Sequence, residues 1–405
     1  MADRSLPALS GLNLAVAGMQ TALGAFLPVF LGTHGWTHAE IGFALSLATA
    51  SSMAAQIPGG ALVDAVHHKR IAVAVCVTMV AMAALIIARF PTPWPVLAAQ
   101  IMQGMASAVL IPAIAAITLA LSRHDALGER FGKNVRFAAL GSMAAAAAMG
   151  VIGTISHRAT LYAAVAIGLV ALLMLRGIHS IDLAAAPTRT AHRTVTRRDH
   201  PPTPWLELAR NRSLLIFAGA MALFQLGNAA LLPIASNGWT ALVGWHTDLI
   251  VAAAIILPQA LVAMLSPSFG RVAETHGRRL VLLLGFGAMP LRAILFALDG
   301  NPYLMVAWQA LDGITGAAFG VMIPLVIADI THRTGRFNLA MGMVALVGGI
   351  GAVLGNPLAG WLADRLGENV AFVGLAAAGL AAFLVIARWM PETREDFAFP
   401  TEAEG

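Results

Sequence analysis

The sequence predicts an all-α membrane protein of 12 transmembrane helices, built as two six-helix repeats. The composition is 59% hydrophobic and only 11% charged over 405 residues, with a mean hydropathy of +0.79. A soluble chain of this length would need far more charge to cover its surface. Long apolar runs recur along the chain, and short polar motifs recur within and between them at a nearly constant offset.

The apolar runs are long enough to be spans, because about 20 apolar residues cross the hydrocarbon core of a bilayer as a helix. We expect spans at residues 9–31, 41–63, 71–90, 95–121, 137–155, 160–178, 213–235, 247–269, 280–298, 303–331, 338–362 and 370–390. The first run is longer than a signal-peptide core, so we expect it to be retained. The single cysteine, Cys76, lies inside the third span, which excludes a disulfide framework and a cysteine-based metal site.

Lysine and arginine are distributed unevenly between the two sides of the predicted membrane. With the N-terminus inside, Arg89, Arg158 and Arg365 face the other side, and Arg292 falls within a span. The remaining basic residues share the side of the N-terminus. Positive charge is retained on the cytoplasmic side, so we expect both termini in the cytoplasm. These charges are scattered over short loops, so we expect no nucleic-acid partner.

Paired motifs indicate an internal repeat. Gln20 in the first span corresponds to Gln225 in the seventh, since each precedes a proline by eight positions. Gln103 in the fourth span corresponds to Asp312 in the tenth, since each precedes a glycine. The offsets, 205 and 209, agree across different helices. They predict two parallel six-helix repeats related by an axis along the membrane normal.

The repeat divides the chain into an N-terminal half, residues 1–176, and a C-terminal half, residues 213–405. Between them, residues 177–212 are polar, basic and rich in proline, which is typical of a linker on the cytoplasmic side. A basic cluster beside anionic lipid would help to anchor this segment to the membrane. Positive-inside orientation alone is the alternative explanation of its charge.

Two similar charged segments follow the second and eighth spans. They read GGALVDAVHHKR at residues 59–70 and GRVAETHGRR at residues 270–279, and in both a carboxylate stands four positions after a glycine. The adjacent His67 and His68 are expected to be solvated rather than to bind a metal. These segments supply the candidate residues of a cytoplasmic gate, namely Gly60, Asp64, Lys69, Arg70, Gly270, Glu274, Arg278 and Arg279.

Six plus six helices, the G-x-x-x-D pattern with its basic residues, and the second copy of that pattern together resemble the major facilitator superfamily. Gly60, Asp64, Lys69 and Arg70 match its signature, although an alanine and a histidine stand where an arginine and a glycine are usual. The resemblance covers essentially the whole chain. It implies two repeats around a central cavity in a bacterial inner membrane.

The resemblance implies a secondary active transporter that moves a small organic solute by alternating access. We favour proton-coupled efflux by antiport; the alternatives are a metabolite uptake facilitator or importer, and a non-transporting membrane sensor. The expected partners are a small-molecule substrate, protons and membrane lipid, and the protein is expected to be a monomer without a cofactor. No phosphate loop of the form G-x-x-x-x-G-K-[ST] is present, and no catalytic dyad suggests an enzyme.

Ionisable residues inside spans are candidates for the mechanism, because a charge at mid-membrane is costly unless it is paired or hydrated. Asp312 and Arg292 lie at similar predicted depths in the tenth and ninth spans. If Asp312 faces the cavity, it would carry the coupling proton; if it pairs with Arg292, the pair would fix two helices. In a third alternative, Arg292 reaches the outer headgroups.

Amide side chains within the spans form a second group of candidates. An interhelical hydrogen bond explains any single amide, but the set predicts a polar path for the substrate. Many drug–proton antiporters of the family have an arginine where this chain has Gln100. Because that basic partner of proton coupling is missing here, we consider Asp312 as the coupling residue. The amides are Gln20, Gln56, Gln100, Gln103, Gln225, Asn228, Gln259, Gln309 and Asn356.

The resemblance also implies that the two gate carboxylates lie at helix N-termini of the opposite half. The expected acceptors are the eleventh helix near residues 337–338 for Asp64 and the fifth near residues 132–134 for Glu274. A carboxylate at a helix N-terminus contributes about 0.3–1 kcal/mol. Such contacts would hold the cytoplasmic side closed, and the alternative is a solvated loop that only marks topology.

Overall fold

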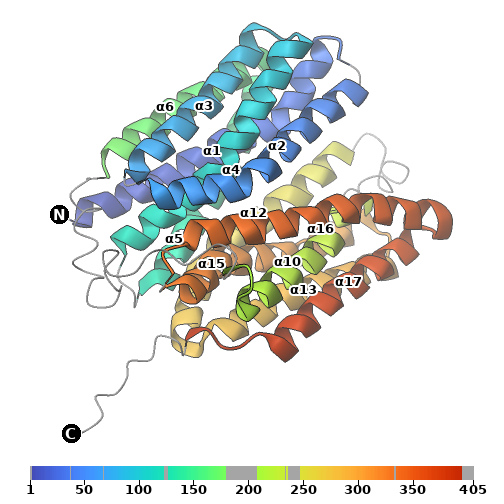
Figure 1. The fold of residues 1–405 in the computed structure, drawn as a ribbon. Coiled ribbons are helices and arrows are strands. Elements are labelled where there is room, and N and C mark those ends of the chain that lie inside the picture. The colour runs from blue at the N-terminus through green and yellow to red at the C-terminus, as the bar shows by residue number, and fades with distance from the viewer. Residues whose placement is uncertain are drawn as a thin grey trace, which may run out of the picture. The chain divides into compact units, whose positions relative to one another are not determined.

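The computed structural model describes residues 2–36, 38–66, 68–122, 126–178, 208–232, 234–235, 247–332 and 334–394 (Figure 1). Within these residues the regular structure is helical, and no strand is present. The predicted linker at residues 177–212 lies largely outside them. Eight of the described helices are long and apolar enough to cross a membrane.

The described helices follow the predicted spans. The N-terminal half contains α1 (Ala2–Thr33), α2 (His38–Ala65), α3 (Lys69–Arg89), α4 (Pro93–Leu121), α5 (Leu127–Ile155) and α6 (His157–Arg176). The C-terminal half contains α10 (Arg212–Asn228), α12 (Thr247–His276), α13 (Arg278–Leu298), α14 (Pro302–Trp308), α15 (Ala310–Thr331), α16 (Phe337–Leu366) and α17 (Glu368–Trp389). Each predicted span overlaps one of them, and α14 and α15 share the tenth span on either side of Gln309. The predicted fold class is therefore confirmed.

The chain folds into two compact units. Unit 1 comprises Met1–His124, Lys133–Pro201 and Arg336–Leu346, and unit 2 comprises Asp125–Gly132, Pro202–Gly335 and Val347–Gly405. Each unit thus corresponds to one half of the sequence, except for a short exchanged segment. The first turns of α16 belong to unit 1, and the first turns of α5 belong to unit 2. These exchanged helix starts carry the acceptors of the gate carboxylates.

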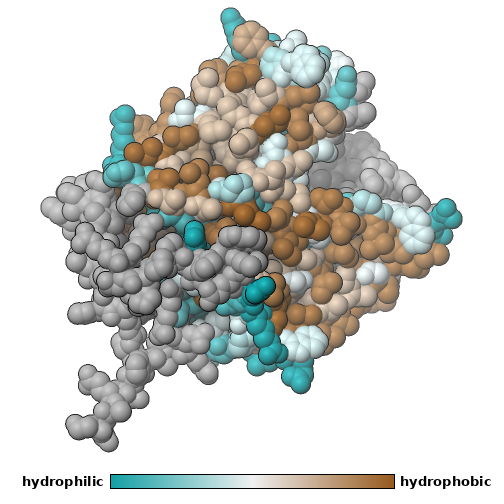
Figure 2. Space-filling view, in the orientation of Figure 1, coloured by the Kyte–Doolittle hydropathy of each residue, from teal (hydrophilic) through white to brown (hydrophobic). Residues whose placement is uncertain are grey.

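Large apolar side chains lie on the outer faces of the helices as well as in the cores. In unit 1, α1 packs on α6, and α4 packs on both α2 and α3; Phe30 is fully buried in this core, whereas Trp94 is 82% exposed. In unit 2, α13 packs on α15 and α17, around buried rings that include Phe286 and Phe296. Figure 2 shows apolar residues over much of the visible surface. Helices that are apolar all round are typical of spans surrounded by lipid.

Glycines mark the closest approaches between helices, and the approaches in the two units correspond. A Cβ atom on Gly342 would overlap the carbonyl oxygen of Gln56 in unit 1, and one on Gly132 would overlap that of Ser266 in unit 2. Gly342 and Gly132 are 210 positions apart, and so are Ser266 and Gln56. The same tight contact therefore occurs once in each unit, as expected of two repeats.

Candidate functional site

The first gate carboxylate, Asp64, lies in the last turn of α2 and not in a loop, because α2 continues to Ala65. Its Oδ1 accepts hydrogen bonds from the backbone N–H of Asn338 at 3.1 Å and from its side-chain amide at 2.6 Å. Its Oδ2 accepts one from the backbone N–H of Leu339 at 2.9 Å. Both backbone groups belong to the first turn of α16, where N–H groups have no partner within the helix. Asp64 therefore caps the helix that the sequence predicted.

Gly60 makes this contact possible. It stands one turn before Asp64 on the same face of α2, and a Cβ atom there would overlap the carbonyl oxygen of Asn338. Burial raises the pKa of the Asp64 carboxyl, while the hydrogen bonds from Asn338 and Leu339 and the charge of Lys69 lower it. The G-x-x-x-D pattern thus combines a close helix approach with a capping carboxylate.

Glu274 makes the equivalent contact in unit 2. Its Oε1 accepts a hydrogen bond of 2.7 Å from the backbone N–H of Gly128, and a Cβ atom on Gly270 would overlap the carbonyl oxygen of Gly128. The predicted acceptor at residues 132–134 is therefore wrong by about one turn. The reason is that α5 begins at Leu127, so the unpaired N–H groups lie earlier in the chain.

Replacing Gly60 with alanine is expected to loosen the Asp64 contact, because the added methyl group overlaps backbone that cannot yield. Overpacking of this kind costs about 1–3 kcal/mol. Hydrogen exchange measured by mass spectrometry should show faster exchange in the peptide that contains Asn338 and Leu339. The control is Gly360→Ala in α16, where an added Cβ meets nothing within 4 Å. Equal exchange in the two variants would contradict the role given to Gly60.

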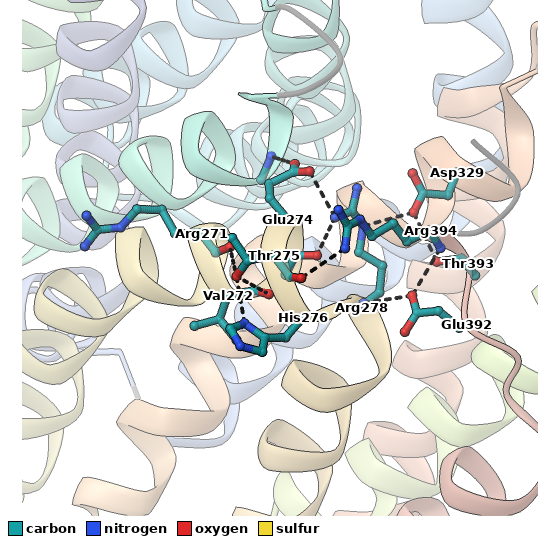
Figure 3. A network of polar contacts seen from close by, with 12 residues as sticks. Arg271, Val272, Glu274, Thr275, His276, Arg278, Asp329, Glu392, Thr393 and Arg394 are labelled. Atoms are coloured by element: carbon teal, nitrogen blue, oxygen red, sulfur yellow. Dashed lines mark hydrogen bonds and ion pairs between the residues drawn. The ribbon is translucent and has the colours of Figure 1, made fainter. Parts of the chain in front are cut away.

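Glu274 also belongs to a larger ionic network (Figure 3). Its Oε2 lies 3.2 Å from Nη1 of Arg278, whose Nε lies 3.1 Å from Oδ2 of Asp329. Arg278 is 3% exposed and Asp329 is 1% exposed, so both charges depend on their partners. The same Oδ2 of Asp329 accepts a hydrogen bond of 3.0 Å from the hydroxyl of Thr393. The network therefore joins α12, α13 and α15 to the segment that follows α17.

Glu392 in that segment caps the start of α13. Its Oε1 accepts from the backbone N–H of Arg278 at 2.8 Å, and its Oε2 accepts from that of Arg279 at 3.0 Å. Gly277, just before the helix, has φ of 91°, and a Cβ atom there would lie 2.5 Å from Glu392. Asp329, Glu392 and Thr393 were not among the residues predicted from the sequence. Asp329 could have indicated this network from the sequence. It is an acidic residue at the end of an apolar run, and its charge requires a partner.

Arg292 and Asp312 form an ion pair within the spans of unit 2. Nη1 of Arg292, on α13, lies 2.5 Å from Oδ1 of Asp312, on α15. Arg292 also donates to the side-chain oxygen of Gln309 at 2.7 Å and to that of Asn228, on α10. Because Arg292 is 3% exposed, it does not reach toward headgroups, and that alternative is wrong. Four of the predicted residues thus meet in one cluster, which we call the Arg292 cluster.

The other predicted amides do not join this cluster through hydrogen bonds in the described part of the chain. Gln100 donates at 3.5 Å to the carbonyl oxygen of Ala44, and the exposed Asn356 donates at 3.4 Å to its own helix. Gln56, Gln100 and Gln103 each have a buried side-chain oxygen that accepts no hydrogen bond from the described residues. The remaining three, Gln20, Gln225 and Gln259, are partly exposed.

The basic residues of the two gate segments lie at helix ends. Lys69 Nζ lies 3.4 Å from the carbonyl oxygen of Val63, near the negative C-terminal end of α2. Arg279 donates to the carbonyl oxygen of Ala387. His67 lies outside the described residues and His68 is exposed. Among the residues that the structure describes, no three histidine, cysteine or acidic side chains come together as metal ligands.

Comparisons with known proteins agree with this fold. The family profile described as Major Facilitator Superfamily matches residues 9–257 and 220–405. An uncharacterised MFS-type transporter of Mycobacterium tuberculosis is 33% identical over 402 residues, covering 95% of this chain and 93% of that protein. The class B tetracycline resistance protein of Escherichia coli is 31% identical over 129 residues, or 32% of this chain and 31% of that protein.

Solved structures show the same architecture. FucP, a transporter crystallised in the outward conformation, has a TM-score of 0.70 at 13% identity, covering 94% of this chain and 97% of that one. At this identity the likeness concerns the fold alone. The family profile and the relative that matches over nearly its whole length establish the family. The chain belongs to the major facilitator superfamily of transporters.

Proposed function

We propose that this transporter is a secondary active antiporter that exports a small organic solute in exchange for protons across a bacterial inner membrane. The observation that carries this proposal is the Arg292–Asp312 pair, in which the Asp312 side chain is 36% exposed and that of Arg292 only 4%. An accessible carboxylate inside a span can take up and release a proton. Pairing alone would fix α13 and α15, so it is the exposure of Asp312 that favours the coupling role.

The surroundings of Arg292 support the same role. When Asp312 takes up a proton it loses its charge, and its interaction with Arg292 weakens. Gln309 and Asn228 still offer their side-chain oxygens to the guanidinium group, so the buried charge keeps two acceptors. The pair can therefore separate without leaving the buried guanidinium group of Arg292 without hydrogen-bond acceptors. An uncompensated buried charge would be costly.

The contacts of Asp64 and Glu274 provide the gate in this proposal. Each consists of one carboxylate on one helix N-terminus, a contact worth about 0.3–1 kcal/mol and up to about 2 kcal/mol when partly buried. Such contacts are strong enough to favour one state and weak enough to break in every cycle. Export rather than import is favoured by the names of partial relatives, a tetracycline resistance protein and a multidrug resistance protein.

The test has two steps. Metabolite content and drug sensitivity are first compared in cells with and without the protein, to find a transported solute. Purified protein in liposomes is then given that solute with and without a pH gradient. We expect transport against the solute gradient only when a pH gradient is imposed. Equal transport under both conditions would contradict proton coupling and leave the facilitator alternative.

A further inference from the structure

Three helices of unit 2, α13, α14 and α15, carry a pair of charges and a pair of aromatic rings one turn apart. On α13, Arg292 and Phe296 are four positions apart. Opposite them, Trp308 ends α14 and Asp312 lies in the first turn of α15. Arg292 pairs with Asp312, and the rings of Phe296 and Trp308 lie with centroids 6.3 Å apart at 37°. Gln309 between them keeps a helical backbone, so Trp308 and Asp312 share one face.

The two members of each pair differ in accessibility. Phe296 is fully buried and Arg292 nearly so, whereas Trp308 and Asp312 are both partly exposed. The face therefore presents an indole ring and a carboxylate, and it hides the phenyl ring and the guanidinium group behind them. A ligand approaching this face meets a carboxylate and an aromatic surface.

The carboxylate makes this face unsuited to contact with lipid. A tryptophan alone would fit a membrane interface, where such residues are common. Asp312 shares the face, however, and a carboxylate exposed to acyl chains is costly. Its Oδ2 accepts no hydrogen bond from the described residues, since its ion pair uses Oδ1. This oxygen therefore needs water, a proton or a positively charged ligand.

α12 packs on α15 beside this face, and the contact is apolar. A Cβ atom on Gly313 would lie 2.6 Å from Cβ of Leu261, and one on Gly316 would lie 2.9 Å from a methyl group of Val262, both on α12. Arg292 offers an anion little access, because the residue is 3% exposed. Its Nη1 is directed at Asp312 and Gln309 and its Nη2 at Asn228, and the Nε that has no partner among the described residues is buried. A cation with apolar groups matches the carboxylate and the ring together.

We propose that Trp308 and Asp312 form a binding site for a lipophilic organic monocation. The inference rests on the proposed function, because it assigns a substrate class to the carboxylate that exchanges the proton there. The cation stacks on the indole ring of Trp308 and lies against Oδ2 of the Asp312 carboxylate. Proton and cation compete for Oδ2 of Asp312, the oxygen that the ion pair with Arg292 does not use, so Asp312 does not hold both at once.

The test compares tetraphenylphosphonium with tetraphenylborate, two ions of similar size and shape but opposite charge. Equilibrium dialysis of each ion against the purified full-length protein in detergent measures binding, and the Asp312→Asn variant supplies the blank. We expect Asp312-dependent binding of a single phosphonium ion and no Asp312-dependent binding of the borate. Asp312→Glu keeps the charge and should keep phosphonium binding, which separates loss of charge from loss of fold.

The aromatic half of the site is tested by Trp308→Leu. We expect the affinity for the phosphonium ion to fall about tenfold, because an indole face interacts favourably with an organic cation. The matched control is Trp389→Leu, which removes another exposed indole at the end of α17 and should leave the affinity unchanged.

Any of three results would overturn the inference: no Asp312-dependent binding of the phosphonium ion, equally strong binding of the borate, or unchanged affinity in Trp308→Leu. Dialysis involves no transport, so the two proposals fail separately. A protein that binds the phosphonium ion but shows no transport driven by a pH gradient contradicts the proposed function alone. Gradient-driven transport without Asp312-dependent cation binding contradicts this inference alone.

Discussion

Replacing Asp312 with asparagine is expected to abolish transport driven by a pH gradient while the protein remains folded. An amide cannot take up and release the proton that the carboxylate exchanges. The new side chain still offers an oxygen to Arg292, and Gln309 and Asn228 offer two more. The measurement is the initial rate in liposomes with an imposed pH gradient, which should fall to the rate of empty liposomes.

The control for this variant is Asp299→Asn, which removes a carboxylate from an exposed position just after α13. It should transport at the rate of the unmodified protein. Thermal unfolding in detergent shows whether Asp312→Asn is folded. If the folded variant still transports at the full rate, the Arg292–Asp312 pair only fixes two helices, and the coupling residue lies elsewhere.

The helices could be predicted because the information for them is local. Apolar run length alone located the spans, and the two charged segments marked the ends of α2 and α12. Asp64 was also assigned the correct helix, because its G-x-x-x-D pattern resembles a family signature with a known acceptor. The start of α5 was placed too late, since residues 127–136 are too polar to count as part of an apolar span.

The composition of the Arg292 cluster could be predicted only in part. The amides look alike in the sequence, and whether one meets Arg292 depends on how each helix is rotated about its axis. Asn228 and Gln309 face the guanidinium group, whereas Asn356 bonds to its own helix. Thr393 and Asp329 are separated by 64 positions, and no periodicity connects them. Contacts of this kind become visible only in the folded chain.

Replacing Arg278 with methionine is expected to destabilise the protein strongly. The variant leaves the buried Asp329 without its positive partner. Of the Asp329 contacts shown in Figure 3, the hydrogen bond from Thr393 then remains. Removing one member of a buried ion pair costs about 3–5 kcal/mol. Thermal unfolding in detergent should show a lower midpoint, and size-exclusion chromatography should show less monodisperse protein. Arg271→Met, at an exposed site on α12, is the control and should change neither.

The double variant Arg278→Met with Asp329→Leu separates the contribution of the network to protein stability from its effect on the position of Glu274. Apolar replacement of both buried charges is expected to recover most of the lost stability. Glu274 then keeps its bond to Gly128 but lacks the arginine that holds its second oxygen in place. Hydrogen exchange at Gly128 should therefore be faster than in the unmodified protein, while exchange at Asn338 in unit 1 should be unchanged. Unchanged exchange at both positions would show that Arg278 stabilises the fold without positioning Glu274.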